Sequence, residues 1–448
     1  MQEGRNNAGN PQPQANCPIG KVHGRVRNVD PFAYMPMVVS LGPYHAGHDD
    51  LQHKEREKPL CMQDICTLSI KNMAVLDFLQ EVIFPLREQA LMYYLHGIND
   101  LRRGRNDVDD DIKLNFRFNL MLLHDAAFLL VAMNALPRRN PNQVGDDEQR
   151  RTSSHGLWTD VAIVHDLLLF ENQVPLVVVE RLYQVATDRT DDFSQIVESF
   201  VWKTLLKHPN SPIPDQKVRT TAHHLLHQCH MLLRPTGYEV VVEIGGASSA
   251  ADENAGVKRR RWHRAMQYHV AGVGLTSKGN IDGGVTHHRL LDVEYSGGAL
   301  EIPVLHVDDN TCSMLRNLIA MEQASTGVGH YVTAYCVFFS RLMCTAQDVT
   351  LLTKKGIVVH QLANDETVAA EFANLCKNVV FNEDGRCNYL REACAAADER
   401  YQSRVRNWMT WLKHKHFRNP CLAIGAVAAV LVTICTVVQA VFAVFPRN

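Results

Sequence analysis

The chain has 448 residues, a formal net charge of -2 and an apolar share of 46%. These values are those of a globular protein with a sizeable core, so they exclude a chain that is disordered throughout. No basic stripe alternates with aromatic residues, so a nucleic-acid partner is not expected.

The first segment, residues 1–22, is rich in Asn, Pro, Gly and Gln and is predicted to be disordered. It lacks the apolar stretch of a secretory signal, and the chain contains no Asn-x-Ser/Thr acceptor. Both observations favour a domain on the cytosolic side of a membrane.

Residues 23–412 are predicted to form one large, mainly helical domain that carries a small β-hairpin. Apolar residues recur at helical spacing in residues 67–95, 313–323 and 365–379. Two alternating runs within residues 289–307 flank Ser-Gly-Gly, a composition that favours a hairpin turn. A further short strand is expected at 238–244. Loops are predicted near residues 102–112, 138–154 and 245–258, where charge or turn formers cluster.

The stretch HDLLLFENQVP, residues 165–175, places polar side chains in an apolar run. If the preceding helix continues toward Pro175, Glu171 extends its inward-facing stripe, and the proline ends the helix. The last helical carbonyls would then lack partners. The carboxamides of Asn172 and Gln173 are the nearest donors able to satisfy them.

A second glutamate, Glu322, lies on the same helical face as Leu315 and Leu318 in RNLIAMEQ. We expect this helix and the first stretch to meet in one buried polar joint, with a nearby cation completing the network. The predicted members of the joint are Glu171, Asn172, Gln173, Pro175, Arg316, Glu322 and Gln323. The alternative is that the two glutamates are the general acid and base of a hydrolase, in which case they would line an open cleft.

The stretch HHLLHQCH places His223, His227 and His230 on one helix face, a spacing that zinc accepts. It lacks the glutamate of HExxH, and no distant ligand can be named, so ordinary helix-surface histidines are expected and no metal site is predicted. The chain has no Walker sequence, no GxGxxG after a strand and no GxSxG elbow, so neither a cofactor site nor a catalytic residue is predicted.

Residues 421–445 contain no charged side chain and are long enough to cross the roughly 30 Å hydrocarbon layer. We predict one membrane-spanning helix there, preceded by a basic juxtamembrane segment, residues 413–420. Positive charge is concentrated before the span, so the positive-inside rule places the large domain in the cytosol. The choice between plasma membrane and endomembrane stays open. Association of two copies through Gly425 and the alanines also stays open, because there is no strict GxxxG.

Seven stretches, in order, resemble a plant family known as domain of unknown function 247, or uncharacterised protein family 0481. They run from YMPMVVSLGPYHAGHDDLQHKEREK through DLLLFENQVPLVVVERLY and IPVLHVDDNTCSMLRNLIAMEQ to the terminal apolar span, over about residues 23–445. Two departures are visible. The chain reads HDAAF where the family usually has Asp-Gly-Cys-Phe, and it has Leu176 and Val177 where the family has an aromatic pair.

The resemblance implies a membrane-anchored plant protein with no established enzymatic activity or cofactor. Some grass members of the family are linked to the self-incompatibility loci that let a stigma reject self pollen. By this analogy we expect recognition of an unknown protein partner. A membrane-tethered hydrolase that uses Glu171 and Glu322, and a purely structural membrane organiser, are the alternatives.

Overall fold

The computed structural model describes residues 17–98, 111–136, 157–208, 212–214, 221–238, 262–278, 289–325, 327–385, 387–403, 425, 428–436 and 439. The N-terminal half contains α1 (Gly24–Arg27), α2 (Gln52–Leu68), α3 (Val75–Phe78), α4 (Phe84–Tyr93), α5 (Asp111–Ala132), α7 (Leu157–Leu167), α8 (Leu176–Thr187), α9 (Phe193–Phe200) and α10 (Leu225–Leu233). Short 3-10 or π-helical turns are η1 (Pro31–Tyr34), η2 (Asp49–Leu51), η3 (Leu79–Ile83) and η6 (Val201–Leu205).

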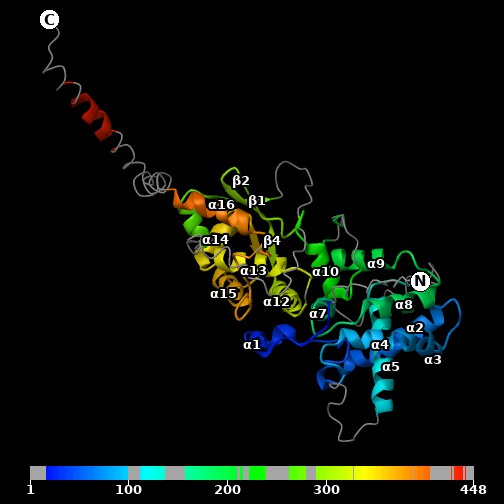
Figure 1. Cartoon of the computed structure of the whole chain (residues 1–448). Coiled ribbons are helices and arrows are strands. Elements are labelled where there is room, and N and C mark those ends of the chain that lie inside the picture. Colours follow the sequence, from blue (N-terminus) through cyan, green and yellow to red (C-terminus); the bar gives the residue numbers. More distant parts are fainter. Residues whose placement is uncertain are drawn as a thin grey trace, which may run out of the picture.

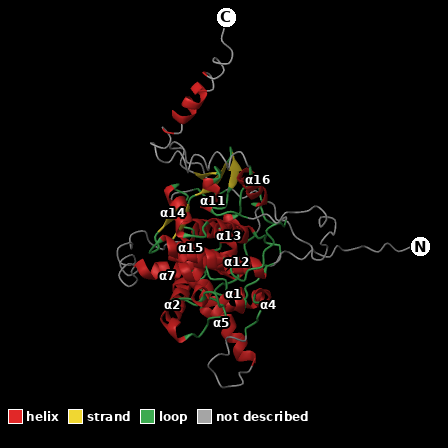
Figure 2. Cartoon of the chain, turned by 90° about the vertical axis from the view of Figure 1, so that its left-hand side faces the viewer, coloured by secondary structure: helices red, strands yellow, loops and turns green. Residues whose placement is uncertain are grey.

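The C-terminal half contains α11 (Ala265–Val270), α12 (Asp309–Ala324), α13 (Tyr331–Leu342), α14 (Ala346–Lys354), α15 (Asp365–Leu375) and α16 (Arg391–Gln402). Its strands are β1 (Gly274–Lys278), β2 (Glu294–Ser296), β3 (Ala299–Pro303), β4 (Leu305–Val307) and β5 (Val358–His360). Figure 1 shows α2–α5 and α8 on one side, α13–α16 with the strands on the other, and α7, α10 and α12 between them. Figure 2 shows how small the strand content is, and the prediction of a mainly helical fold is confirmed.

The predicted hairpin is confirmed. Strands β2 and β3 pair in antiparallel register, and Gly297 and Gly298 form the turn between them with φ of 56° and 86°. Both values lie in the left-handed region that glycine adopts without strain. The parallel pairing of β1 with β3 and of β4 with β5 was not predicted, because short strands far apart in sequence carry no local pairing signal.

Helix α5 is central to the N-terminal half and packs against α2 and α8. Among the described residues, Ile112–Ala132 is the one helix long and apolar enough to cross a membrane. However, 61% of its apolar stretch is buried inside the fold, and the core helix of a soluble protein can be equally long and apolar. This helix is therefore weak evidence for a membrane span.

Several boundaries differ from the predictions. The helix expected over 67–95 is interrupted between α2 and α3, where Asn72 adopts a left-handed φ of 51°. Residues 17–22, expected to be disordered, are placed in the structure, because Cys17 and Ile19 are fully buried in the core. Residues 111 and 112 belong to α5 rather than to a loop.

Other predicted segments lie outside the described residues. These are most of the 102–112 loop, almost all of 138–154, the 245–258 loop, the strand at 239–244, the 413–420 segment and most of the predicted span. Within the span, residues 428–436 are helical, and the apolar side chains of Val430, Leu431, Val432 and Ile434 are exposed.

Candidate functional site

The turn between α7 and α8 is the centre of the candidate site. Helix α7 ends at Leu167, well before the predicted end at Pro175, so the ENQ residues lie in a turn. The side-chain amide of Asn172 donates to the carbonyl of Asp166 (2.9 Å), and that of Gln173 donates to the carbonyl of Leu167 (2.8 Å). The carboxamides satisfy the orphaned carbonyls as predicted. They do so from outside the helix, because their side chains replace the backbone N–H groups of a further turn.

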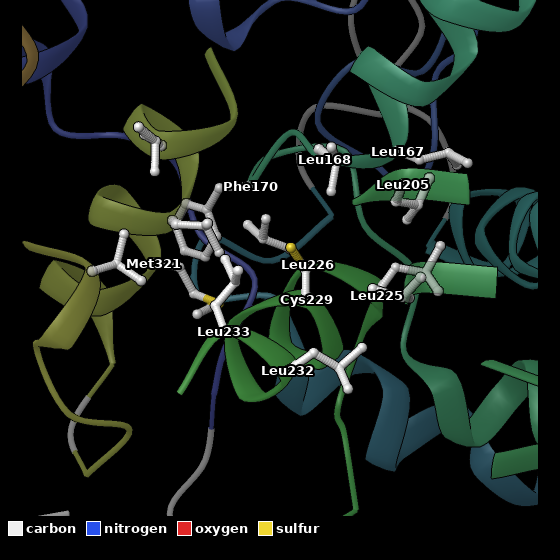
Figure 3. Packing of buried hydrophobic residues seen from close by; sticks show 14 of the residues in the cluster. Leu167, Leu168, Phe170, Leu205, Leu225, Leu226, Cys229, Leu232, Leu233 and Met321 are labelled. Atoms are coloured by element: carbon white, nitrogen blue, oxygen red, sulfur yellow. The ribbon is translucent and has the colours of Figure 1, made fainter. Parts of the chain in front are cut away.

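The same turn is attached to α10 and α12. The backbone N–H of Phe170 donates to the Asn317 side-chain oxygen of α12 (2.8 Å), and Gln173 Oε1 accepts from the N–H of Leu226 in α10 (3.1 Å). Figure 3 shows Phe170 among apolar side chains of these helices, which include Leu226, Cys229, Leu233 and Met321. The turn therefore joins helices from both halves of the molecule.

Residues 17–45, called here the N-terminal segment, pass close to both halves. The N–H of Ile19 donates to the Tyr93 carbonyl at the end of α4 (2.7 Å). Asn378, just after α15, donates to the Arg25 carbonyl in α1 (2.8 Å). Figures 1 and 2 both place α1 beside α12.

Asp166 holds one stretch of the N-terminal segment by its backbone. Its fully buried carboxylate accepts hydrogen bonds from the N–H groups of Met37, Val38 and Val39 at 2.8, 2.8 and 2.9 Å. His165 Nδ1 lies 3.0 Å from the same carboxylate. Consecutive N–H groups around one carboxylate form a compact anion site, so this stretch has a fixed backbone.

Glu171 holds an earlier stretch of the same segment. It accepts from the N–H of Val22 (2.5 Å) and from the guanidinium of Arg27, and His45 Nε2 lies 3.5 Å from its second oxygen. Burial alone would raise the pKa of Glu171, but the nearby His45 imidazole and the hydrogen bonds from Arg27 and Val22 outweigh it and hold the pKa below its usual value. Glu171 is therefore a buried anion with its own cation.

Asn172 and Asp125 hold the end of the segment. Asn172 Oδ1 accepts from the N–H of Leu41 (2.6 Å), and its Nδ2 donates to the carbonyl of Val39 (3.0 Å). Asp125 in α5 accepts from the N–H of Gly42 (2.8 Å).

Asp125 also belongs to a buried charge cluster with Lys58 of α2. Lys58 Nζ lies 2.7 Å from Asp125, 2.6 Å from Glu55 and 2.5 Å from the Ser40 carbonyl. Burial raises the pKa of Asp125 to about 6, while the Lys58 ammonium opposes that rise. The cluster therefore ties α2 and α5 to the N-terminal segment.

The contribution of α12 was not predicted. Asn317 Nδ2 donates to the Ala33 carbonyl (2.8 Å), and Ser313 Oγ lies 3.1 Å from both that carbonyl and His165 Nε2. Ser313, His165 and Asp166 are thus connected in the order of a Ser-His-Asp triad. However, Ser313 lies inside a helix rather than on an exposed turn, and its hydroxyl faces the Ala33 carbonyl. The connection positions the N-terminal segment.

Glu322 belongs to a different network. One carboxylate oxygen lies 2.8 Å from His230 Nε2 and accepts from the N–H of Val332 (2.9 Å). The other accepts from the N–H and the hydroxyl of Thr333 at 2.8 and 2.5 Å. Tyr331 stacks on His230, and its hydroxyl lies 2.7 Å from His230 Nδ1. This network joins α10, α12 and the start of α13.

The other predicted members of the joint lie apart from Glu322. Arg316 is buried, and its guanidinium lies 3.5 Å from Asp30 and 3.4 Å from Glu371. Gln323 is exposed and accepts from the N–H of Val380 (3.3 Å). Pro175 immediately precedes α8 and is its N-cap residue.

The single predicted joint is therefore two networks. Among the described residues, Glu171 and Glu322 share no hydrogen-bond donor, and no cation connects them. The two segments meet through Asn317, five residues before Glu322, and the side-chain oxygen of Asn317 accepts from the N–H of Phe170. In the described part of the chain, the Asn317 amide makes the polar link between the turn and α12 that the sequence suggested for the glutamates.

The histidines of α10 are not ordinary surface residues. His224, His227 and His230 are buried. Burial, with smaller effects of His223 and His230, lowers the pKa of His224 to about 3, and burial also lowers the pKa of His227 well below its usual value. In the part of the chain that the structure describes, no group of three or more His, Cys, Asp or Glu side chains could hold a metal ion.

A surface groove of about 650 Å³ lies at the C-terminal end of α5, beside α9 and η6. Its lining includes Met133, Glu198 and Lys203, and none of the residues of either buried network. The two glutamates therefore do not line this groove.

The whole sequence is similar to a family of known proteins. A family described as a plant protein of unknown function, DUF247, matches residues 19–435. The chain is 24% identical over 453 residues to UPF0481 protein At3g47200 of Arabidopsis thaliana, covering 96% of this chain and 86% of the relative. It is 21% identical over 447 residues to Putative UPF0481 protein At3g02645 of the same plant, covering 79% and 77%. No solved structure matches the chain. Because the match extends over nearly the whole sequence, the chain belongs to the plant protein family DUF247.

Proposed function

We propose that this protein is a membrane-anchored recognition protein that binds a protein partner and carries out no catalysis. The observation that carries the proposal is the exposure of three large apolar side chains on the N-terminal segment. Phe32, Met35 and Met37 are 79%, 40% and 50% exposed. Aromatic residues and methionine are enriched in protein interfaces, and grouped exposed apolar residues mark interaction sites.

Buried polar side chains hold the backbone that carries these exposed residues. Asp166 binds the N–H of Met37, and Asn317 and Ser313 bind the carbonyl of Ala33. A loop held in one conformation loses less conformational entropy on binding than a loop that must first be ordered. An exposed apolar surface on a backbone that buried polar groups hold in place is therefore well suited to binding a partner protein.

The surroundings of the two glutamates support recognition over hydrolysis. Glu171 is 3% exposed and Glu322 is fully buried, and each is surrounded by hydrogen-bond donors from the protein itself. A general acid and base pair must reach a substrate and a water molecule, which needs an open cleft. A structural organiser would have no need of a prepared exposed surface.

Membrane anchoring rests on residues 421–445, which carry no charge. The basic residues before this span favour a cytosolic orientation of the large domain. A role in self-incompatibility is a prediction by family resemblance alone.

The proposal is tested by site-specific photo-crosslinking of the full-length protein in plant membranes. A photoreactive residue is placed at position 32 and, as a control, at position 70, where Ile70 is 70% exposed. We expect a specific protein adduct from position 32 only. The purified partner should bind the unmodified protein and lose affinity about tenfold with Phe32→Ser. Equal adducts from both positions, or unchanged affinity, would refute the proposal.

A further inference from the structure

The N-terminal segment contacts the end of α15 and the residues that follow it. Asp30 and Glu371 lie on either side of the Arg316 guanidinium, which also donates to the Asn374 carbonyl (3.2 Å). Asn378 then donates to the Arg25 carbonyl. Residues 25–32 and 371–380 are therefore neighbours, although they are far apart in sequence.

The two most exposed large apolar side chains among the described residues both lie on these neighbouring stretches. Val380 is 83% exposed, and Phe32 is 79% exposed. The N–H of Val380 donates to Gln323 of α12, so its loop is attached to the same helix that holds the N-terminal segment. Exposed apolar side chains from two distant parts of the chain thus lie on stretches that contact each other.

The charge at this surface is positive. Arg25 and Lys377 are exposed, and neither forms an ion pair with another residue in the described part of the chain. The nearby carboxylates of Asp30 and Glu371 both face Arg316. The carboxylates of an acidic partner could therefore pair with Arg25 and Lys377, because the acidic side chains of residues 25–32 and 371–380 already face Arg316.

We propose that the surface formed by Arg25, Phe32, Lys377 and Val380 docks an acidic segment of a partner protein that also carries apolar anchor residues. This inference rests on the proposed recognition function and adds the chemistry of the partner. Apolar side chains supply contact area, and the two cations set register and accelerate encounter.

An anionic lipid surface offers similar chemistry, but the arrangement favours a protein. Figures 1 and 2 share the vertical axis, and both place α16 well above α1. Helix α16 is the last described element before the predicted span. The docking surface therefore lies away from the part of the domain from which the chain continues toward residues 421–445.

The test uses the full-length protein in nanodiscs of neutral lipid, with phage-displayed random peptides as the probe. We expect the enriched peptides to combine Asp or Glu with large apolar residues. Their affinity should fall about tenfold with Phe32→Ser and with the double change Arg25→Glu and Lys377→Glu. Lys355→Glu, which reverses an exposed charge elsewhere, should leave their affinity unchanged.

Exchanging the charges of the protein and the peptide tests the proposal most directly. Peptides whose acidic residues are replaced by lysine should bind the Arg25→Glu, Lys377→Glu protein better than the unmodified protein. Enriched peptides without acidic residues, or affinity insensitive to the charge reversal, would overturn the acidic partner and leave the crosslinking result at position 32 intact. Charge-dependent binding of the nanodiscs to added phosphatidylserine vesicles, with no peptide enriched, would assign the surface to lipid and overturn the proposal.

Discussion

Replacing each buried glutamate by glutamine should have unequal effects on stability. Glu322 accepts two hydrogen bonds at each carboxylate oxygen, and one donor on each side is a backbone N–H, from Val332 or Thr333. A carboxamide has one accepting oxygen. Whichever way it turns, its NH₂ group faces one of these buried N–H groups. The unpaired donors and the lost charge should lower the free energy of unfolding by roughly 2–4 kcal/mol.

Glu171→Gln should be milder. The amide oxygen can keep the position that accepts from Val22 and Arg27, while the NH₂ group faces His45 Nε2, which accepts in one tautomer. The change removes the negative charge beside Arg27, which is 28% exposed and therefore partly hydrated. The expected loss in the free energy of unfolding is about 0.5–1.5 kcal/mol.

The double variant tests whether the two networks are separate. Because they share no donor among the described residues, the two losses should add within about 0.5 kcal/mol. The assay is urea unfolding of the detergent-solubilised full-length protein, followed by tryptophan fluorescence, with an unchanged denaturant slope as the control. A coupling energy above about 1 kcal/mol, or Glu171→Gln as costly as Glu322→Gln, would refute the assignment of two networks.

Three further outcomes follow from the geometry. Gly42→Ala should lower the free energy of unfolding by roughly 2–4 kcal/mol, because the φ of Gly42 is +69° and a Cβ would lie 2.7 Å from the Gln173 carbonyl oxygen. Gly47→Ala is the matched control. Its φ is +80° and a Cβ there would meet no atom within 4 Å, so the expected loss is about 1 kcal/mol. Stability should also fall as the pH drops below about 6.5, and it should go on falling toward the folded pKa of His224, about 3, because the lowered pKa values of His224 and His227 let the unfolded chain take up protons that the folded chain does not. The stabilisation is complete above the unfolded histidine pKa of about 6.5, and it declines by up to ~1.4 kcal/mol per pH unit and histidine as the pH falls toward the pKa values of the folded chain. His227→Gln should reduce the slope of the unfolding free energy against pH. An unchanged slope would contradict this prediction. Finally, deletion of residues 421–448 should move the protein from the membrane to the soluble fraction in cell fractionation, and continued sedimentation with membranes after an alkaline wash would contradict the proposed anchor.

Local chemistry determined much of what could be predicted. Helical spacing identified α12 and α15, and the Ser-Gly-Gly turn identified the β2–β3 hairpin, because these signals lie within a few residues of the structure that they specify. The same holds for Asn172 and Gln173, whose carboxamides satisfy carbonyls four to six residues earlier. The sequence also indicated the family, since its motifs recur in order along nearly the whole chain.

Tertiary structure alone decided which groups the buried carboxylates bind. Asp166 and Glu171 accept mainly from backbone N–H groups of residues 22 and 37–39. Nearly every residue carries such a donor, so no side-chain pattern marks these partners in the sequence. Helical periodicity correctly placed Glu322 on the buried face of α12, whereas Glu171 is buried in the turn after α7 and not on a helix. Their separation into two networks was not accessible in this way, because periodicity fixes which face of a helix is buried but not which distant segment covers it.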